Sequence, residues 1–147
     1  MQHVAKAWIS ELLLKAPFIQ PFGVELLAAI PEKIHLRLPF RQEISGVDQH
    51  MHSGAIAALV EFAGTVAAVS GIEKQDAVAG CITSQMNLTF VSTPYGTGVD
   101  AVATVAHRTE KQVVVDVCVY GDDSRILAKA TTICRIFEQP RLVNKAA

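Results

Sequence analysis

The chain has 147 residues, of which 50% are hydrophobic and 18% are charged, and its formal net charge is -1. This length is typical of a single domain, and the composition supports a buried core and excludes an intrinsically disordered chain. Because the charge is close to zero and no lysine- or arginine-rich run is present, we expect neither a nucleic acid nor a membrane as partner.

The N-terminal part of the sequence predicts a helix followed by two strands. Residues 4–14 place apolar side chains at helical spacing, and Pro17 and Pro21 then end the helix. Residues 23–30 are mostly apolar, and residues 33–38 alternate between apolar and polar side chains, which is typical of a half-buried strand. No uncharged apolar run approaches the roughly 18 residues of a membrane span, so we expect a cytoplasmic protein.

The central part predicts a buried helix. After an irregular polar segment, residues 39–52, small and apolar residues fill every face of residues 53–70, and Gly71 follows where a C-terminal cap is expected. Alanine favours helices and is rare in strands. A helix that is apolar all round is a buried helix, so we expect other elements to wrap around this one.

The remaining sequence predicts strands joined by short turns. The predicted strands are residues 79–91, 99–107, 112–120 and 126–137. Short turns between them indicate antiparallel hairpins. The order of elements predicts an α+β fold, in which an antiparallel sheet curls around one central helix. We expect one domain over residues 1–147, with an N-terminal helix at about 4–14, a core at about 18–138 and a short C-terminal tail.

Glu61 lies near the middle of the predicted buried helix, where a glutamate is rare unless it is paired or functional. The residues three and four positions away share its helix face, and they are small: Ala57, Ala58, Gly64 and Thr65. Thr65 can donate a hydrogen bond to the carboxylate, and a ligand or another backbone can approach it closely. An exposed stripe or a basic partner would make Glu61 an ordinary residue, but the apolar surroundings favour a catalytic carboxylate.

The start of the same helix is the second candidate feature. Ser53 is the predicted N-cap, and the first backbone N–H groups of a helix can hold an anion or a developing oxyanion. An ordinary capped helix would explain the same residues. Because Ser53 and Glu61 are about 12 Å apart along a helix axis, one reacting carbonyl cannot touch both in a single chain. If both act on one substrate, we expect a dimer or higher oligomer with sites at the interface, formed by antiparallel pairing of two such helices.

The stretch from His52 to Glu61, H-S-G-A-I-A-A-L-V-E, resembles the motif of the hotdog-fold acyl-CoA thioesterases, which reads H-G-G, six residues, then Asp or Glu. The closest kinds are the phenylacetyl-CoA and hydroxybenzoyl-CoA thioesterase-like families. The later segments that also resemble this family are Thr83–Phe90, the Pro94–Gly98 turn and Leu127–Phe137. The resemblance covers about residues 18–138. It implies a hotdog fold, in which a curved antiparallel sheet wraps a long central helix, and the hydrolysis of a thioester to CoA and a carboxylic acid.

The resemblance also implies a role for each matching residue. Glu61 would be the general base or the nucleophile, and backbone N–H groups at the helix start, in the stretch His52, Ser53 and Gly54, would form the oxyanion hole. Thr65 would position the Glu61 carboxylate or the attacking water. Thr83 stands where some members of the family have a serine near the reacting water. The residues expected to contact substrate are Gln49, His50, Asn87 and Arg108. Apart from the resemblance, the side chains of Arg108, Lys111 and Arg135 could bind the CoA phosphates, although a plain surface charge is the more ordinary reading of each.

Two departures from the family pattern leave a second function open. Ser53 replaces the usual glycine, although its backbone donor remains. Gly46 stands where the family often has an Asn or Gln that orients the carbonyl or the water, and Gln49 or Asp48 could substitute for it. The alternative is therefore a hotdog module that binds an acyl-CoA or another apolar ligand without turnover. A hydratase or dehydratase is a weaker option, because its histidine-containing signature is absent.

Other reactive residues predict no further site. His50 and His52 have an H-x-H spacing without an evident third ligand, so we expect no metal. Cys81, Cys118 and Cys134 lie on predicted strands and are expected to be reduced packing residues. We expect no cofactor, because CoA is part of the substrate, and we expect the partners to be an acyl-CoA and further copies of the chain, as a homodimer or homotetramer.

Overall fold

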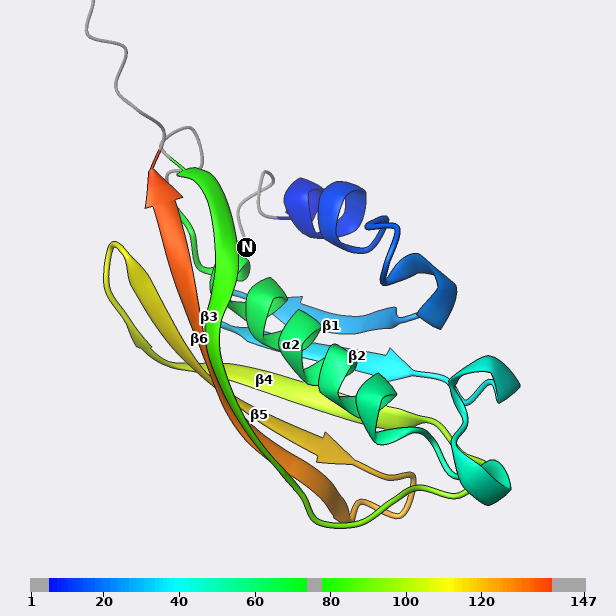
Figure 1. Ribbon diagram of the computed structural model, residues 1–147. Coiled ribbons are helices and arrows are strands. Elements are labelled where there is room, and N and C mark those ends of the chain that lie inside the picture. The colour runs from blue at the N-terminus through cyan, green and yellow to red at the C-terminus, as the bar shows by residue number, and fades with distance from the viewer. Residues whose placement is uncertain (1–5, 74–77, 139–147) are drawn as a thin grey trace, which may run out of the picture.

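A computed structural model of the protein describes residues 6–73 and 78–138 (Figure 1). The helices are η1 (Trp8–Leu13), η2 (Gln20–Phe22), η3 (Gln42–Ile44), η4 (Val47–Gln49) and α2 (Ser53–Ser70). The strands are β1 (Glu25–Ile30), β2 (Lys33–Leu38), β3 (Val78–Phe90), β4 (Val99–Arg108), β5 (Gln112–Tyr120) and β6 (Ile126–Glu138). Among them, α2 is the only helix longer than six residues in the described part of the chain.

The strands form one antiparallel sheet in the order β1-β2-β4-β5-β6-β3, so β1 and β3 are its edges. Figure 1 shows the sheet curving around α2, which lies in its concave face. Successive side chains of a strand point to opposite faces of the sheet. Because apolar and polar residues alternate along the strands, the apolar side chains line the face that α2 covers. In β5 the four odd-numbered valines from Val113 to Val119 are all buried, and they face the helix side of the sheet.

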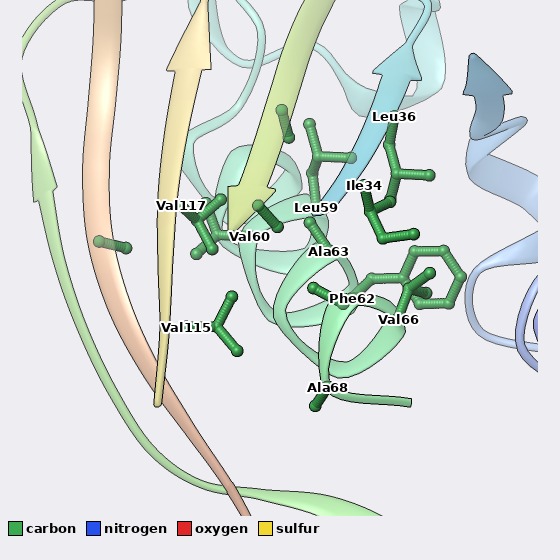
Figure 2. Close-up of a cluster of buried hydrophobic side chains, with 14 of the residues drawn as sticks. Ile34, Leu36, Leu59, Val60, Phe62, Ala63, Val66, Ala68, Val115 and Val117 are labelled. Atoms are coloured by element: carbon green, nitrogen blue, oxygen red, sulfur yellow. The ribbon is translucent and has the colours of Figure 1, made fainter. Parts of the chain in front are cut away.

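The core lies between α2 and the concave face of the sheet (Figure 2). Leu59, Val60 and Val66 of α2 pack with Ile34 of β2 and Val117 of β5, and each is almost fully buried. Burying such a side chain stabilises the fold by about 1.5–3 kcal/mol. By length and composition α2 could cross a membrane, but 72% of it is buried inside the protein. It is therefore the core helix around which the sheet is built.

Most predicted elements are confirmed, including the helix over 53–70 and the strands over 33–38 and 112–120, which match to the residue. The first strand begins at Glu25, two residues later than predicted, and the segment 39–52 contains two short 3-10 helices. In the predicted helix at 4–14, residues Trp8–Leu13 form a π-helix, and residues 4 and 5 lie outside the described residues. The predicted C-terminal tail, residues 139–147, also lies outside them.

Two contacts fix the position of α2 against the sheet. At Gly64, an added Cβ would lie only 2.2 Å from Thr132 Oγ1 on β6, so the absence of a side chain allows this close approach. At the C-terminal end of α2, Ser70 Oγ accepts a hydrogen bond of 2.9 Å from the backbone N–H of Glu32, in the β1–β2 turn. Together these contacts set how far the helix lies from β6 and from the β1–β2 turn.

Candidate functional site

Glu61 lies where α2 passes the edge strand β3, and two threonine hydroxyls hold its carboxylate. Thr83 Oγ1 of β3 donates a hydrogen bond of 2.7 Å to Glu61 Oε1. Thr65 Oγ1, one helical turn away, donates to the same oxygen at 3.3 Å, and the two hydroxyl oxygens are 3.2 Å apart. Within the described residues, Glu61 Oε2 has no hydrogen-bond partner. The structure thus brings together Glu61, Thr65 and Thr83, which we call the carboxylate cluster.

The prediction that the central helix is buried all round is wrong for one stripe. Glu61 is exposed, Gly54 is exposed, and Ala57 and Ala58 are only half-buried. The sheet curls around one side of α2 and η1 contacts the helix as well, but in the described part of the chain no element of the protomer covers the stripe that carries these four residues. A small-residue stripe therefore runs from the start of the helix to the carboxylate cluster and is open to a ligand or to a second copy of the chain.

The helix start is capped by His52 and not by Ser53. His52 has extended backbone angles (φ −61°, ψ 135°), and its ring Nδ1 accepts a hydrogen bond of 2.8 Å from the backbone N–H of Gly54. The imidazole thus does what a Ser or Asn side chain does at an N-cap. A Cβ on Gly54 would lie 2.9 Å from this Nδ1, so the cap needs a glycine there.

This cap changes which backbone donors are available at the helix start. The N–H of Gly54 is engaged by His52, whereas the N–H of Ser53 has no hydrogen-bond partner among the described residues. Ser53 is thus the free donor at this end. Ser53 and Glu61 lie on one continuous helix, so they are about 12 Å apart along its axis. One carbonyl group cannot contact both of them in a single protomer.

Gln49 and His50, expected to contact substrate, lie in the loop beside the helix start. Gln49 Nε2 donates to Gln42 Oε1 at 3.0 Å, and the side-chain oxygen of Gln49 has no hydrogen-bond partner among the described residues. The His50 ring packs edge-on against Tyr95, with ring centroids 5.1 Å apart. In the same loop a Cβ on Gly46 would meet only ordinary contacts of 3.7 Å, so this position does not require a glycine for lack of space.

Asn87 and Arg108 lie elsewhere. Asn87 is exposed on β3, four residues beyond Thr83. Arg108 lies at the C-terminal end of α2, where its Nε donates to Glu32 Oε1 at 2.5 Å and its Nη2 to the carbonyl of Ala68 at 2.8 Å. A cavity of about 650 Å³ is found at this end, and Glu61 is not among its lining residues. The structure does not bring Arg108 to the helix start, so its contact with a CoA phosphate stays a prediction.

Sequence reasoning missed two thiols behind the carboxylate cluster. Thr83 pairs with Cys134 across β3 and β6, and the buried Cys134 Sγ lies 4.0 Å from Thr83 Oγ1. Hydrogen bonding from Cys81 above all, and then from Thr83 and Thr65, lowers the pKa of Cys134 to about 7. The interaction with Cys134 and burial raise the pKa of Cys81. The signal in the sequence was that Cys81 and Thr83 are two residues apart and so share a strand face.

The described residues hold no group of three histidine, cysteine, aspartate or glutamate side chains that could bind a metal ion. His50 and His52 are used in other ways, because the His50 ring packs on Tyr95 and the His52 ring caps α2. The chemistry available at the site is therefore that of a carboxylate, hydroxyl groups, thiols and backbone N–H groups.

Comparison with known proteins gives a family and a set of similar structures. The sequence model of the thioesterase superfamily matches residues 48–128. Among curated proteins no sequence matches this chain. The PaaI protein of Escherichia coli, from the phenylacetic acid degradation operon, has a TM-score of 0.80 at 15% identity, covering 92% of this chain and 94% of its own.

Two further solved structures are thioesterases or members of a thioesterase family. A thioesterase from Haemophilus influenzae has a TM-score of 0.78 at 16% identity and covers 92% of this chain and 90% of its own. A thioesterase family protein from Silicibacter pomeroyi has a TM-score of 0.83 at 17% identity, and the match covers 92% of this chain and 99% of its own. At these identities the likeness shows the fold, and it confirms the expected hotdog fold.

Proposed function

The chain belongs to the thioesterase superfamily, and from this premise we propose that it hydrolyses an acyl-CoA thioester to CoA and a carboxylic acid. The observation that carries the proposal is the carboxylate cluster. Glu61 is exposed and is the only charged residue of α2, and two hydroxyl groups orient one of its oxygens. This arrangement leaves Glu61 Oε2 available for a water molecule or for the substrate.

In the proposed reaction Glu61 acts as a general base. Its Oε2 takes a proton from water as the water oxygen attacks the thioester carbon, and the carbonyl oxygen becomes an oxyanion. The C–S bond then breaks, the CoA sulfur receives the proton from Glu61, and the acid leaves. Direct attack by Glu61 through a mixed anhydride would give the same products. Thr65 and Thr83 hold the carboxylate in one orientation throughout.

The free backbone N–H of Ser53 is the proposed donor to the oxyanion. Because Ser53 and Glu61 of one protomer are too far apart, we propose that each site combines Glu61 of one protomer with Ser53 of a second. The open stripe of α2 supports this pairing, since small side chains allow two helices to approach closely. Exposed apolar residues on the helix side of β3, Met86 and Phe90, give a second copy further surface to cover.

The proposed function is tested by thiol release from short-chain, long-chain and aromatic acyl-CoAs. We expect Glu61→Gln to lower kcat by about 10²–10⁴-fold, because it removes the base but preserves the shape of the side chain. The exposed Glu110→Gln, on the β4–β5 turn, is the matched control and should keep the wild-type rate. A Glu61→Gln enzyme with the full rate would exclude this function.

A non-catalytic acyl-CoA-binding module is the second candidate, and Gly46 is the observation that favours it. The family often has an Asn or Gln at this position, and the loop has space for a Cβ there, but this chain carries no side chain. Tight binding of acyl-CoA without thiol release, in wild type and in Glu61→Gln alike, would support this alternative. We further propose that no cofactor is needed and that the protein acts in the cytoplasm, where its three free cysteines would be reduced in the absence of an oxidant.

A further inference from the structure

We propose that Cys81 and Cys134 form a thiol pair that a hydroperoxide oxidises reversibly to a disulfide, and that this bond disrupts the neighbouring carboxylate cluster. The effect on turnover rests on the proposed function, whereas formation of the disulfide does not. Neither thiol has a part in the proposed hydrolysis.

The sheet register places the two thiols on one face. Thr83 of β3 lies opposite Cys134 of β6, and Cys81 lies opposite Ile136. Because side chains two residues apart share a strand face, Cys81 is a diagonal neighbour of Cys134 on the helix side of the sheet. Cys81 is half-buried and Cys134 is buried, so Cys81 is the thiol that a small oxidant can reach.

The pair is chemically suited to oxidation because the thiolate is the reactive form of cysteine. The Cys81 thiol interacts with Cys134 and, with the nearby hydroxyls, holds the pKa of Cys134 at about 7. The same interaction raises the pKa of Cys81, so the pair loses one proton near neutral pH and keeps the other. The remaining proton can pass between the two sulfurs as Cys81 reacts.

The proposed steps balance with one equivalent of peroxide. The Cys134 thiolate takes the proton of Cys81 as the Cys81 sulfur attacks a peroxide oxygen. The O–O bond breaks, and the leaving hydroxide takes up a proton to become water. The Cys134 sulfur then attacks the sulfenic acid on Cys81, and its proton leaves with the hydroxide as a second water. The peroxide is reduced, and the two thiols are oxidised to one disulfide.

Bridging this pair requires a local movement of β3. Diagonal neighbours in a sheet have Cα atoms about 7–8 Å apart, whereas disulfides usually need about 4.4–6.8 Å. Among the strands that the structure describes, β3 pairs only with β6, and register shifts at Val78/Gly80 and Thr83/Gln85 flank Cys81. A Cβ on Gly80 would meet nothing within 4 Å, so no neighbouring side chain packs on that side of the strand next to Cys81.

The movement has a direct consequence for the site. Thr83 is two residues from Cys81 and donates the 2.7 Å hydrogen bond to Glu61. A shift of β3 toward Cys134 therefore displaces Thr83 from the carboxylate. A disulfide closed under strain is easily reduced, so a thiol reductant should return the cluster to its active arrangement.

The test counts thiols in the full chain after treatment with hydrogen peroxide at about pH 8, where Cys134 is ionised. We expect the mass to fall by two hydrogens, only Cys118 to be alkylated by iodoacetamide, and a peptide linked through Cys81 and Cys134. Dithiothreitol should restore all three thiols. Cys118→Ala, the matched control, should form the same cross-link, whereas Cys81→Ala and Cys134→Ala should form none.

Thiol release from acyl-CoA is measured on the same samples. Oxidised wild type and oxidised Cys118→Ala should lose activity at least about tenfold, and regain it on reduction. Three alkylatable thiols after oxidation, or sulfinic acids without a cross-link, would overturn the disulfide. A cross-linked protein with full activity would overturn the switch. If the reduced protein hydrolyses nothing but still forms the cross-link, the proposed function fails and the thiol pair stands.

Discussion

Thr83 shows how one hydroxyl group can join two elements at a candidate site. It lies on the edge strand β3, yet its proton is donated to Glu61 on α2, and its oxygen lies near Thr65 and Cys134. A hydroxyl in this position restricts the rotamers of the glutamate and fixes which carboxylate oxygen is left without a hydrogen bond within the described residues. His52 plays a comparable local part, because its ring occupies the N–H of Gly54 and leaves that of Ser53 free.

At the residue scale, Thr83→Val should lower kcat and leave KM nearly unchanged. Valine has the shape of threonine but donates no hydrogen bond, and a hydrogen bond to a charged group contributes about 1.5–3 kcal/mol. We expect kcat to fall by about tenfold or more. Thr83→Ser should keep most of the rate because it keeps the donor.

Steady-state kinetics and denaturant unfolding of the same proteins check this prediction. Thr89→Val, an exposed position on the same strand, is the control for a changed strand residue. A Thr83→Val enzyme with wild-type kcat would show that the hydroxyl does not position Glu61.

At the scale of the element, the position of α2 relative to the sheet depends on contacts at its two ends and at its middle. The N-terminus is capped by His52, and Arg108 and Ser70 tie the C-terminus to the β1–β2 turn at Glu32. Between them, Gly64 lets the helix approach β6. The carboxylate cluster spans this middle section, so the distance between helix and sheet decides whether Glu61 reaches Thr83.

Gly64→Ala should destabilise the protein, although alanine is the better helix former by about 1 kcal/mol. The new Cβ would lie 2.2 Å from Thr132 Oγ1, and helix or strand must move to relieve the overlap. Overpacking of this kind costs about 1–3 kcal/mol, so we expect a net loss in the free energy of unfolding by urea and a fall in kcat.

The double variant Gly64→Ala/Thr132→Ala is the control for this steric argument. It removes the hydroxyl oxygen and methyl group of Thr132, leaving only its Cβ, 3.1 Å from the new atom. Stability and kcat should therefore recover in part. A single Gly64→Ala variant more stable than wild type would contradict the close approach of α2 to β6.

At the scale of the whole molecule, the proposed site needs two copies of the chain. The protomer leaves the stripe of α2 uncovered and keeps Ser53 and Glu61 about 12 Å apart on one helix. A symmetric dimer of antiparallel helices would place each Ser53 near the Glu61 of the other copy, which gives two equivalent sites.

Mixing two inactive variants tests this arrangement. Ser53→Pro deletes the backbone donor, and proline is tolerated at the first helical position after an extended residue such as His52. Ser53→Pro and Glu61→Gln should each be inactive alone. Refolded together in equal amounts, they should recover up to about a quarter of wild-type activity, because half of the dimers contain one intact site.

Ser53→Ala keeps the backbone N–H and should remain active, which separates the donor from the side chain. Size-exclusion chromatography with light scattering shows whether the variants still associate. If mixed dimers form but their activity does not recover, Ser53 of one copy and Glu61 of the other do not act together at one site.

The sequence by itself determined the elements and the local pairing within α2. Strand alternation and the apolar helix run are local patterns with periods of 2 and 3.6 residues, so residues 33–38, 53–70 and 112–120 could be predicted to the residue. The Glu61–Thr65 hydrogen bond followed from helical spacing alone, because residues four apart share a face. Thr83 was indicated only by the family resemblance.

Only the tertiary structure decided which distant residues meet and which face of α2 stays open. Thr83 is 22 positions from Glu61, Cys134 is 51 from Thr83, and Arg108 is 76 from Glu32. Such pairs depend on strand order and register, which no local pattern encodes. The exposure of Glu61 likewise depends on how far the sheet curls around the helix, since an apolar sequence has the same pattern whether its own sheet or a second protomer covers it.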